Sequence, residues 1–238
     1  MIYMQNSNLV SIVIPTYEMS GEGSFFLSHS LKKILEQTYK NIEVIVTDHS
    51  KDEEIELVCK NFEQNLNIKY IKNNVDFGSS SSNINNGIKN SKGFIIKILM
   101  QDDFLYEKNC IEKIVSVFET EKTCNWLVTG CVFGGKNFIP NGKMYPTYTD
   151  DVVLGTNKIG SPSVLTIKNE NPLFFDKNLL WMMDCEYYKR LYDSFGKPNV
   201  LLENNVYITQ HIHQLTNSLE NERKNYETKL ICKKYKKC

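Results

Sequence analysis

The sequence lacks three features that would assign it at once to a familiar class. Its 28 Lys and Arg residues equal its 28 Asp and Glu residues, so it has no excess positive charge with which to bind a nucleic acid. The longest apolar runs, residues 9–15 and 94–100, are far shorter than the roughly 20 residues that cross a bilayer. The first nine residues contain no apolar stretch typical of a secretory signal. We therefore expect a protein that neither binds nucleic acid nor spans a membrane.

The seven cysteines form no C-x-x-C pair and no close group with histidine. A disulfide framework or a structural zinc site normally shows an even number of cysteines or tight ligand spacing, so we predict structural thiols in a reducing compartment. A length of 238 residues is sufficient for one domain with a buried core. We expect a cytoplasmic protein that is either free or located at the inner face of a membrane.

Short β-branched runs alternate with helical patterns through the first 120 residues. The runs at residues 9–15, 42–48, 68–72 and 94–100 predict strands, and the segments between and after them predict helices at 25–38, 53–64, 81–91 and 108–121. Strands and helices that alternate at this spacing indicate βαβ units. The fold class predicted is α/β, with a mostly parallel central sheet flanked by helices.

The pattern changes in the second half of the chain. Further strands are predicted at 126–133, 163–168 and 205–213, and a helix at 181–195. Residues 134–160 are rich in Gly, Pro, Asn and Tyr, which is typical either of a functional loop or of short strands that periodicity does not reveal.

The C-terminal segment 219–238 holds seven Lys and Arg against three Glu, an excess of four positive charges. This basic segment is either a helix or tail that contacts an anionic membrane surface or a partner, or a solvated C-terminal helix.

Polar and acidic residues follow each predicted strand of the first half, where ligands bind in open α/β sheets. They include Thr16 after the first strand, Asp48 after the second, and the pair Asp102 and Asp103 after the fourth. No G-x-G-x-x-G or G-x-x-x-x-G-K-[ST] motif is present, which excludes the usual backbone cradles for phosphate. The acidic pair either holds Mg²⁺ or Mn²⁺ beside a diphosphate or simply forms a turn.

The first half contains an ordered series of motifs: V-S-I-V-I-P-T-Y (10–17), Q-T-Y-x-N-I-E-V-I-V-x-D (37–48), N-x-x-x-G (74–78), N-x-G-I (85–88) and K-G-F-I-I-K-I-L-x-Q-D-D (92–103). This series resembles the family 2 glycosyltransferases with the GT-A fold, closely over residues 9–103 and more loosely to about residue 218. The resemblance implies one domain over 1–218, with a donor half (9–104), an acceptor half (105–218) whose sheet has a small antiparallel portion, and a basic extension (219–238).

The resemblance also implies where a nucleoside diphosphate sugar and a metal bind. The donor nucleotide would contact Pro15, Thr16, Tyr17, Glu18, Asp48, Gly78, Asn85, Gln101 and Asp102. Mn²⁺ or Mg²⁺ would be held by Asp102, Asp103 and His211, the histidine of the segment Q-H-I-H-Q-L-T (210–216). The choice between the two aspartates, and between His211 and His213, stays open. Met100 and Ile84 stand where relatives often have Asp and Arg.

The acceptor side is implied by two further segments. W-M-M-D-C-E-Y-Y-K-R-L (181–191) resembles the family's E-D-x-x-x-x-x-R-L helix, so the resemblance implies Asp184 as the catalytic base. The alternative is a helix N-terminal acid that complements the helix dipole. Met183 replaces the acid that usually precedes this base. I-G-S-P-S (159–163) resembles an acceptor loop. The residues implied to bind acceptor are Ser161, Pro162, Trp181 and Glu186.

The predicted function is inverting, metal-dependent transfer of a sugar from a UDP- or dTDP-sugar to a hydroxyl of a glycan or glycolipid. Two alternatives remain open. A sugar-nucleotide nucleotidyltransferase shares the βαβ layout, although residues 15–23 offer no cation for a triphosphate. A non-catalytic nucleotide- or glycan-binding module would explain the replacements at Met100, Ile84 and Met183.

Overall fold

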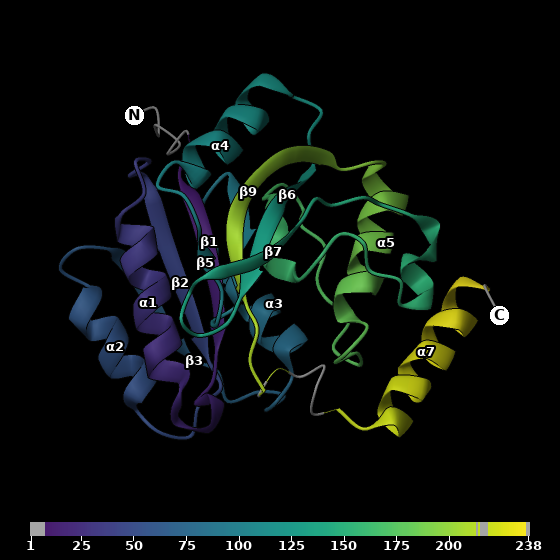
Figure 1. Ribbon diagram of the computed structural model, residues 1–238, viewed down its shortest axis with the longest axis horizontal. Helices are drawn as coiled ribbons and strands as arrows, with labels where there is room; N and C mark the ends of the chain where they lie inside the picture. The colour runs from purple at the N-terminus through teal and green to yellow at the C-terminus, as the bar shows by residue number, and fades with distance from the viewer. Residues whose placement is uncertain (1–7, 213, 215–218, 237–238) are drawn as a thin grey trace.

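The computed structural model describes residues 8–212, 214 and 219–236 of the chain. In these residues a single twisted sheet runs through the molecule, with helices packed around it (Figure 1). The strands follow the order β3-β2-β1-β4-β8-β6-β9-β5, and β7 pairs with β6. The sheet is continuous across the two predicted halves, because β4 pairs with β8.

The first half forms the parallel part of the sheet. The residues of β1 and β2 are all buried, as expected for strands that helices cover on both faces. The elements confirm the strands and helices predicted from periodicity: β1 (Val10–Thr16), α1 (Gly23–Leu35), β2 (Ile42–Asp48), α2 (Glu54–Phe62), β3 (Asn67–Lys72), α3 (Ser80–Asn90) and β4 (Ile95–Ile98).

The second half makes the sheet mixed. β6 and β9 pair in parallel, whereas β8 runs antiparallel to both β4 and β6. Two further pairs are antiparallel: β7 with β6, and β5 with β9. The small antiparallel portion predicted for the acceptor side is therefore confirmed. The α-helices and strands that the structure describes in the second half are β5 (Phe104–Leu105), α4 (Cys110–Thr120), β6 (Trp126–Gly134), β7 (Pro140–Met144), β8 (Leu165–Lys168), α5 (Met183–Phe195), β9 (Asn199–Thr209) and α7 (Asn221–Tyr235).

The segment 134–160, which the sequence left open, contains a short strand and a short helix. β7 is an edge strand whose polar residues lie mostly exposed, so it shows no hydrophobic alternation. A 3₁₀ helix, η2 (Asp150–Leu154), follows it, and two others, η1 (Met19–Gly21) and η3 (Pro162–Val164), lie beside β1 and β8. Short strands that periodicity did not reveal therefore account for part of this segment.

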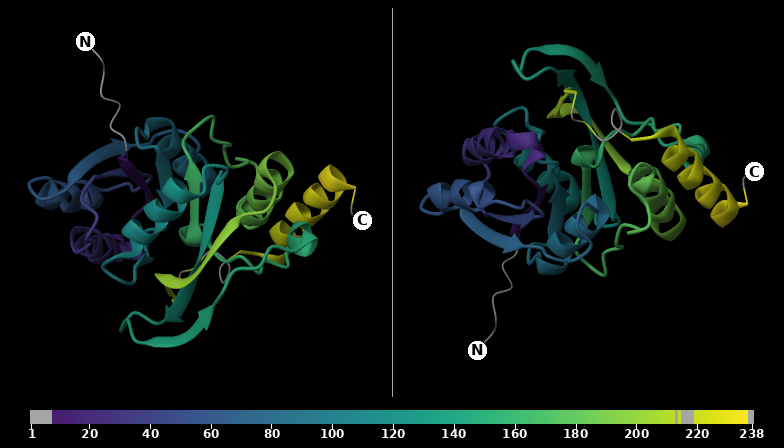
Figure 2. Two further views of the ribbon diagram at one scale, coloured as in Figure 1. Left: turned by 90° about the horizontal axis from the view of Figure 1, so that it is seen from above. Right: turned by 90° about the horizontal axis from the view of Figure 1, so that it is seen from below.

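The basic C-terminal segment forms helix α7, which lies beside α5 at the end of the molecule away from α1 and α2 (Figures 1 and 2). Arg223 and Lys234 make ion pairs within the fold, whereas Lys229 and Lys233 are exposed. Contact of this helix with a membrane stays a prediction. Among the described helices, none is both long and apolar enough to cross a bilayer.

Large aromatic side chains fill the core on the acceptor side. Trp126, Tyr187 and Tyr188 are almost completely buried, and the Trp126 indole donates a hydrogen bond to the Gly196 carbonyl at 3.0 Å. Cysteines 59, 110, 124, 131 and 185 are free and buried, as predicted for structural thiols, whereas Cys232 is disulfide-bonded, contrary to that prediction. The core thus fixes α5 against the sheet.

Helix α3 approaches β1 so closely that only glycine fits at one position. A Cβ atom at Gly87 would lie 2.2 Å from Cγ1 of Val13. Because overpacking of a core typically costs 1–3 kcal/mol, Gly87→Ala is expected to lower the free energy of unfolding by about that amount, despite the better helix propensity of alanine. Urea unfolding measures the change, and Lys89→Ala on the exposed face of α3 should stay within about 0.5 kcal/mol. Equal stability of the two variants would contradict the packing.

Candidate active site

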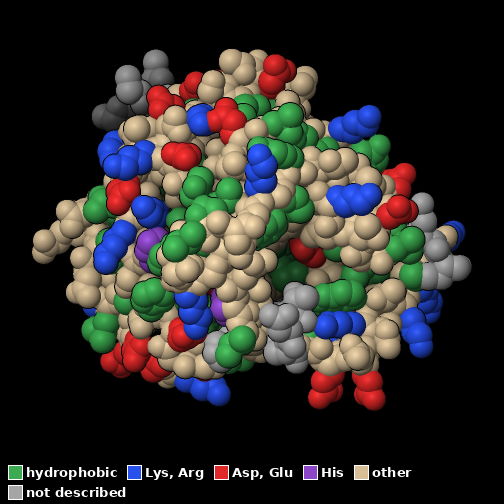
Figure 3. Space-filling view, viewed as in Figure 1, with side chains coloured by type: hydrophobic (Ala, Val, Ile, Leu, Met, Phe, Trp, Pro, Cys, Tyr) green, Lys and Arg blue, Asp and Glu red, His purple; other side chains and the backbone are tan. Residues whose placement is uncertain are grey.

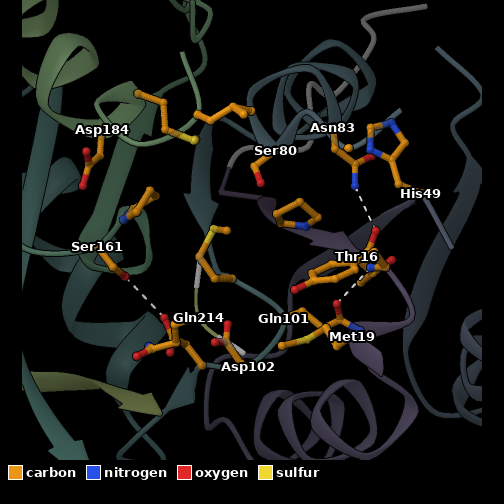
Figure 4. Close-up of a pocket in the computed structure, with 18 of the residues that line it drawn as sticks. Thr16, Met19, His49, Ser80, Asn83, Gln101, Asp102, Ser161, Asp184 and Gln214 are labelled. Atoms are coloured by element: carbon orange, nitrogen blue, oxygen red, sulfur yellow. Dashed lines mark hydrogen bonds between the residues drawn. The ribbon is translucent and has the colours of Figure 1, made fainter. Parts of the chain in front are cut away.

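A pocket of about 370 Å³ opens where the carboxyl ends of β1 and β4 meet the N-terminus of α5. The space-filling view shows this face hollowed, with an acidic side chain inside the hollow (Figure 3). Asp184 and Ser161 lie on one side of the pocket, Thr16 and His49 lie on the other, and Asp102 lies between them (Figure 4). Several pocket residues carry no motif that could have identified them: Met19, Ser80, Asn83, Leu180 and Ile208.

The end of β1 forms part of the predicted donor side. Pro15, Thr16 and Tyr17 line the pocket, but Glu18 does not. The Gln101 side chain accepts a hydrogen bond from the Tyr17 amide at 2.9 Å and donates one to the Gly23 carbonyl at 2.9 Å. Gln101 therefore joins the ends of β1 and β4, while the Tyr17 ring, 44% exposed, is available to stack on a flat group.

The structure does not bring Asp48 to the pocket wall. Its carboxylate is fully buried and accepts hydrogen bonds from Ser50, from the Tyr70 hydroxyl at 2.8 Å and from Lys72 Nζ at 3.1 Å. These bonds fix the ends of β2 and β3, because a buried carboxylate must be fully paired. A role in direct nucleoside binding does not fit this environment.

His49, the residue after Asp48, lines the pocket in its place. Its Nε2 atom lies 3.1 Å from the Val75 carbonyl, and its ring stacks on Phe77 with centroids 5.3 Å apart. Burial lowers the pKa of His49, so the ring is neutral at physiological pH. Sequence analysis missed this residue, although its position directly after a buried strand was a usable signal.

Asp102 and His211 meet at the floor of the pocket. His211 Nε2 lies 2.8 Å from Asp102 Oδ2, although the two residues are far apart in the sequence. His211 follows the end of β9 and packs on the Phe26 ring with centroids 5.2 Å apart. The structure therefore brings together two of the three residues implied as metal ligands. His213 lies outside the described residues.

Asp103 also borders the pocket but has both carboxylate oxygens engaged. It accepts hydrogen bonds from the Ser163 hydroxyl at 2.5 Å, the Ser161 hydroxyl at 3.3 Å and the Thr209 amide at 3.0 Å. Burial, with a smaller effect of the Asp102 charge, raises the pKa of Asp103. This environment favours a structural role for Asp103 and leaves Asp102 as the aspartate that can bind a ligand.

Gly78 lines the pocket with a φ of +80°, a backbone conformation that glycine adopts without strain. Asn85 does not line it, because its amide both donates to and accepts from the backbone of Phe175, at 2.8 and 2.7 Å. Glu186 is fully buried between α5 and α7, and Nε of Arg190, on α5 itself, lies 2.6 Å from its carboxylate. The structure thus separates Asn85 and Glu186 from the other predicted site residues.

Asp184 stands at the start of α5 on the side implied to bind acceptor. Its carboxylate accepts hydrogen bonds from the Asn157 side chain and from the Cys185 amide, both at 2.7 Å. Burial raises the pKa of Asp184 to about 6, which suits a group that must exchange a proton near neutral pH. Ser161, Pro162 and Trp181, the other residues implied to bind acceptor, also line the pocket.

A divalent metal would find an incomplete set of protein ligands here. In the part of the chain that the structure describes, no three His, Cys, Asp or Glu side chains are grouped closely enough to hold a metal. The carboxylate of Asp102 and the imidazole of His211 are nevertheless suitable ligands for Mn²⁺. Such a site fits a metal shared with a bound diphosphate, because Mg²⁺ and similar ions commonly combine one or two carboxylates with phosphate oxygens and water.

The sheet order, with a pocket at the carboxyl ends of its parallel strands, defines an open α/β fold, in which ligands bind at this edge of the sheet. Residues 11–191 match the family model described as "Glycosyl transferase family 2". This match covers most of the chain, and the chain therefore belongs to that family. The predicted family and its GT-A fold are confirmed.

Known proteins similar to this chain agree with the family. An uncharacterized glycosyltransferase of Rickettsia bellii is 34% identical over 154 residues, which are 63% of this chain and 20% of that protein. S. aureus TarS 1–349 in complex with UDP-GlcNAc superposes with a TM-score of 0.69 at 17% identity, over 94% of this chain and 65% of that one.

The mannosyltransferase PcManGT from Pyrobaculum calidifontis, in complex with GDP-Man and Mn²⁺, has a TM-score of 0.61 at 14% identity, over 87% of this chain and 57% of that one. At such identities these two likenesses show the fold. The chain spans less than two thirds of the length of each of the three proteins.

The raised pKa of Asp184 predicts a pH-dependent loss of stability. The pKa is about 6 in the folded protein against an ordinary 3.8, so the folded state binds the proton more tightly and this contribution to stability is lost as the pH rises through about 6. Compared with the wild type, Asp184→Asn should gain about 1–3 kcal/mol in free energy of unfolding near pH 7.5 and much less near pH 4. Urea unfolding of both proteins across this range measures the difference. A difference that does not change with pH would contradict the shift.

Proposed function

We propose that this chain transfers a sugar from a nucleoside diphosphate donor, UDP- or dTDP-linked, to a hydroxyl group of a glycan or glycolipid, with inversion at the anomeric carbon. The observation that carries the proposal is the arrangement of one pocket. Asp102 and His211 lie at its floor, and Asp184, with a pKa raised to about 6, lies on the wall opposite Thr16 and His49. Inverting transfer needs such a base on the face opposite the leaving diphosphate.

The donor nucleoside would occupy the side of the pocket formed by the ends of β1 and β2. The exposed Tyr17 ring offers a surface for a base, and the neutral imidazole of His49 offers a polar edge beside it. Gly78 leaves space for a close backbone approach of the nucleotide. The UDP-GlcNAc in TarS and the GDP-Man in PcManGT show that proteins of this fold bind nucleotide sugars, which supports this placement.

Asp102 and His211 would hold Mn²⁺ or Mg²⁺ together with the donor diphosphate. When bound, the metal would neutralise the negative charge that develops on the leaving diphosphate. Asp103 would act through the backbone, because its bonds to Ser163 and Thr209 keep the segments that carry Asp102 and His211 together. The Mn²⁺ in PcManGT supports a metal in a protein of this fold.

Asp184 would remove the proton from the acceptor hydroxyl. The Asn157 side chain and the Cys185 amide each donate to one carboxylate oxygen, which orients the carboxylate and leaves lone pairs for the hydroxyl. The hydroxyl oxygen then attacks the anomeric carbon while the bond to the diphosphate breaks, and Asp184 later releases its proton to water. Trp181 and the Ser161–Pro162 turn would contact the acceptor sugar.

Replacement of the base should abolish transfer and preserve donor binding. We expect Asp184→Asn to lower kcat by about 10²- to 10⁴-fold, the usual contribution of a general base, while the Kd of UDP changes little. Asp193→Asn removes an exposed carboxylate from the same helix and should leave kcat within about twofold. Steady-state rates and calorimetric titration with UDP measure both quantities. Near-normal transfer by Asp184→Asn would show that another group is the base.

The metal site predicts that nucleotide binding depends on a divalent ion. UDP should raise the midpoint of thermal unfolding by several degrees in the presence of Mn²⁺ and much less in its absence. Asp102→Asn and His211→Ala should remove the metal-dependent part, whereas Asp151→Asn, at an exposed carboxylate, should not.

Two results would contradict this assignment. An equal shift by UDP with and without Mn²⁺ would overturn the metal site. Indifference to UDP, dTDP and GDP alike would favour a module that binds no donor.

A further inference from the structure

We propose that Glu227, on the C-terminal helix α7, is a positioning residue for the catalytic base. The inference rests on the proposed function, because it takes Asp184 as that base. Glu227 lies outside the part of the chain that matches the family, residues 11–191. It is nevertheless completely buried, which is unusual for a carboxylate on a helix with many exposed charged residues.

The Glu227 carboxylate accepts hydrogen bonds from three consecutive backbone amides. Oε1 accepts from the Leu180 amide, and Oε2 accepts from the amides of Trp181 and Met182, each at 2.9 Å. These residues form the turn that enters α5, two positions before Asp184. The N-cap residue Met182 makes no side-chain cap, and the carboxylate from a different helix binds its amide and those of the two residues before it.

Arg223, one turn before Glu227 on α7, completes this contact. Its Nε lies 2.7 Å from Glu227 Oε1, and its Nη2 donates to the Asn178 carbonyl at 2.7 Å. Glu227 is therefore paired with one guanidinium and three amides, which offsets the cost of burying its charge. Together the two residues bind both ends of the turn from Asn178 to Met182.

A second contact fixes the other end of α7 against α5. Lys234 Nζ lies 2.8 Å from Glu186 Oε1 and 3.2 Å from Asp176 Oδ2, and the Tyr235 hydroxyl donates to Glu186 at 3.0 Å. Glu186 is thus a contact between helices and not a residue of the pocket. Figure 2 shows the two helices next to each other in both of its views.

These contacts determine the shape of one pocket wall. Leu180, Trp181, Met183 and Asp184 all line the pocket, and the Lys224 ammonium lies 5.9 Å from the centroid of the Trp181 ring. Without Glu227, three backbone amides, of which that of Met182 is buried, would lose their acceptor, and the turn would have to move to reach water. The base Asp184 would then be misplaced. A displacement of about 1 Å in a catalytic group can cost about 100-fold in rate.

The test compares Glu227→Gln and Glu227→Ala with a control on the same helix. Glutamine keeps the volume of the side chain but places an NH₂ group against amide donors, so it tests the interaction even if alanine destabilises the fold. Glu222→Gln removes an exposed carboxylate five residues away. For each protein, kcat and the donor KM are measured, together with the Kd of UDP and the hydrogen exchange of the amides of residues 180–182.

We expect both Glu227 variants to lower kcat by about 10- to 100-fold and to leave the Kd of UDP within about twofold. The three amides should exchange at least about tenfold faster, and Glu222→Gln should match the wild type in every measurement. The inference is wrong if Glu227→Gln retains wild-type kcat, or if kcat and UDP affinity fall in parallel, which would indicate general loss of structure. A wild-type protein that transfers no sugar, or an active Asp184→Asn variant, would instead refute the proposed function.

Discussion

The buried carboxylate of Asp103 is the interaction on which the rest of the site depends. It joins three segments that are distant in the sequence: the end of β4, the Ser161–Ser163 turn before β8, and the last residue of β9. Asp102 precedes it and His211 follows Thr209 by two residues, so the same bonds set the distance between them. The parallel and the antiparallel parts of the sheet meet at this carboxylate.

A second buried ionisable group, Lys97, binds the same Ser161–Ser163 turn. Lys97, on β4, is completely buried and donates from Nζ to the Ser163 carbonyl, while the Ser163 hydroxyl donates to Asp103. Burial lowers the pKa of Lys97 to about 7 and raises that of Asp103, so each group loses part of the free energy that water would give to its charged form. The two buried groups lie where the donor and acceptor sides of the pocket meet. They hold Ser163 in place, because Lys97 binds its carbonyl and Asp103 binds its hydroxyl.

The sequence predicted the elements of the first half well because each is encoded locally. The apolar runs of β1 and β2 are continuous, and the motif ending in Asp102 and Asp103 marks the end of β4. Side-chain direction and long-range pairing are not encoded in this way. Asp48 and His49 are adjacent, and only the packing of Tyr70 and Lys72 decides that the first is buried and the second faces the pocket. In the sequence, Glu227 is likewise indistinguishable from the other charged residues of the C-terminal helix. Its contact with the amides of the turn before α5 becomes evident only from the packing of the two helices.

The position of α7 has a consequence for where the functional unit ends. The match to the family closes at residue 191, before the segment 210–216 that holds His211. A chain cut at that boundary would keep Asp102 and Asp184 but would expose the buried face of α5, with Glu186 facing water and no acceptor for the amides of the turn before it. A boundary drawn from homology would thus leave out α7 and its contacts with α5. The side chains that hold the turn before Asp184 therefore lie in part of the chain that the family motifs do not cover.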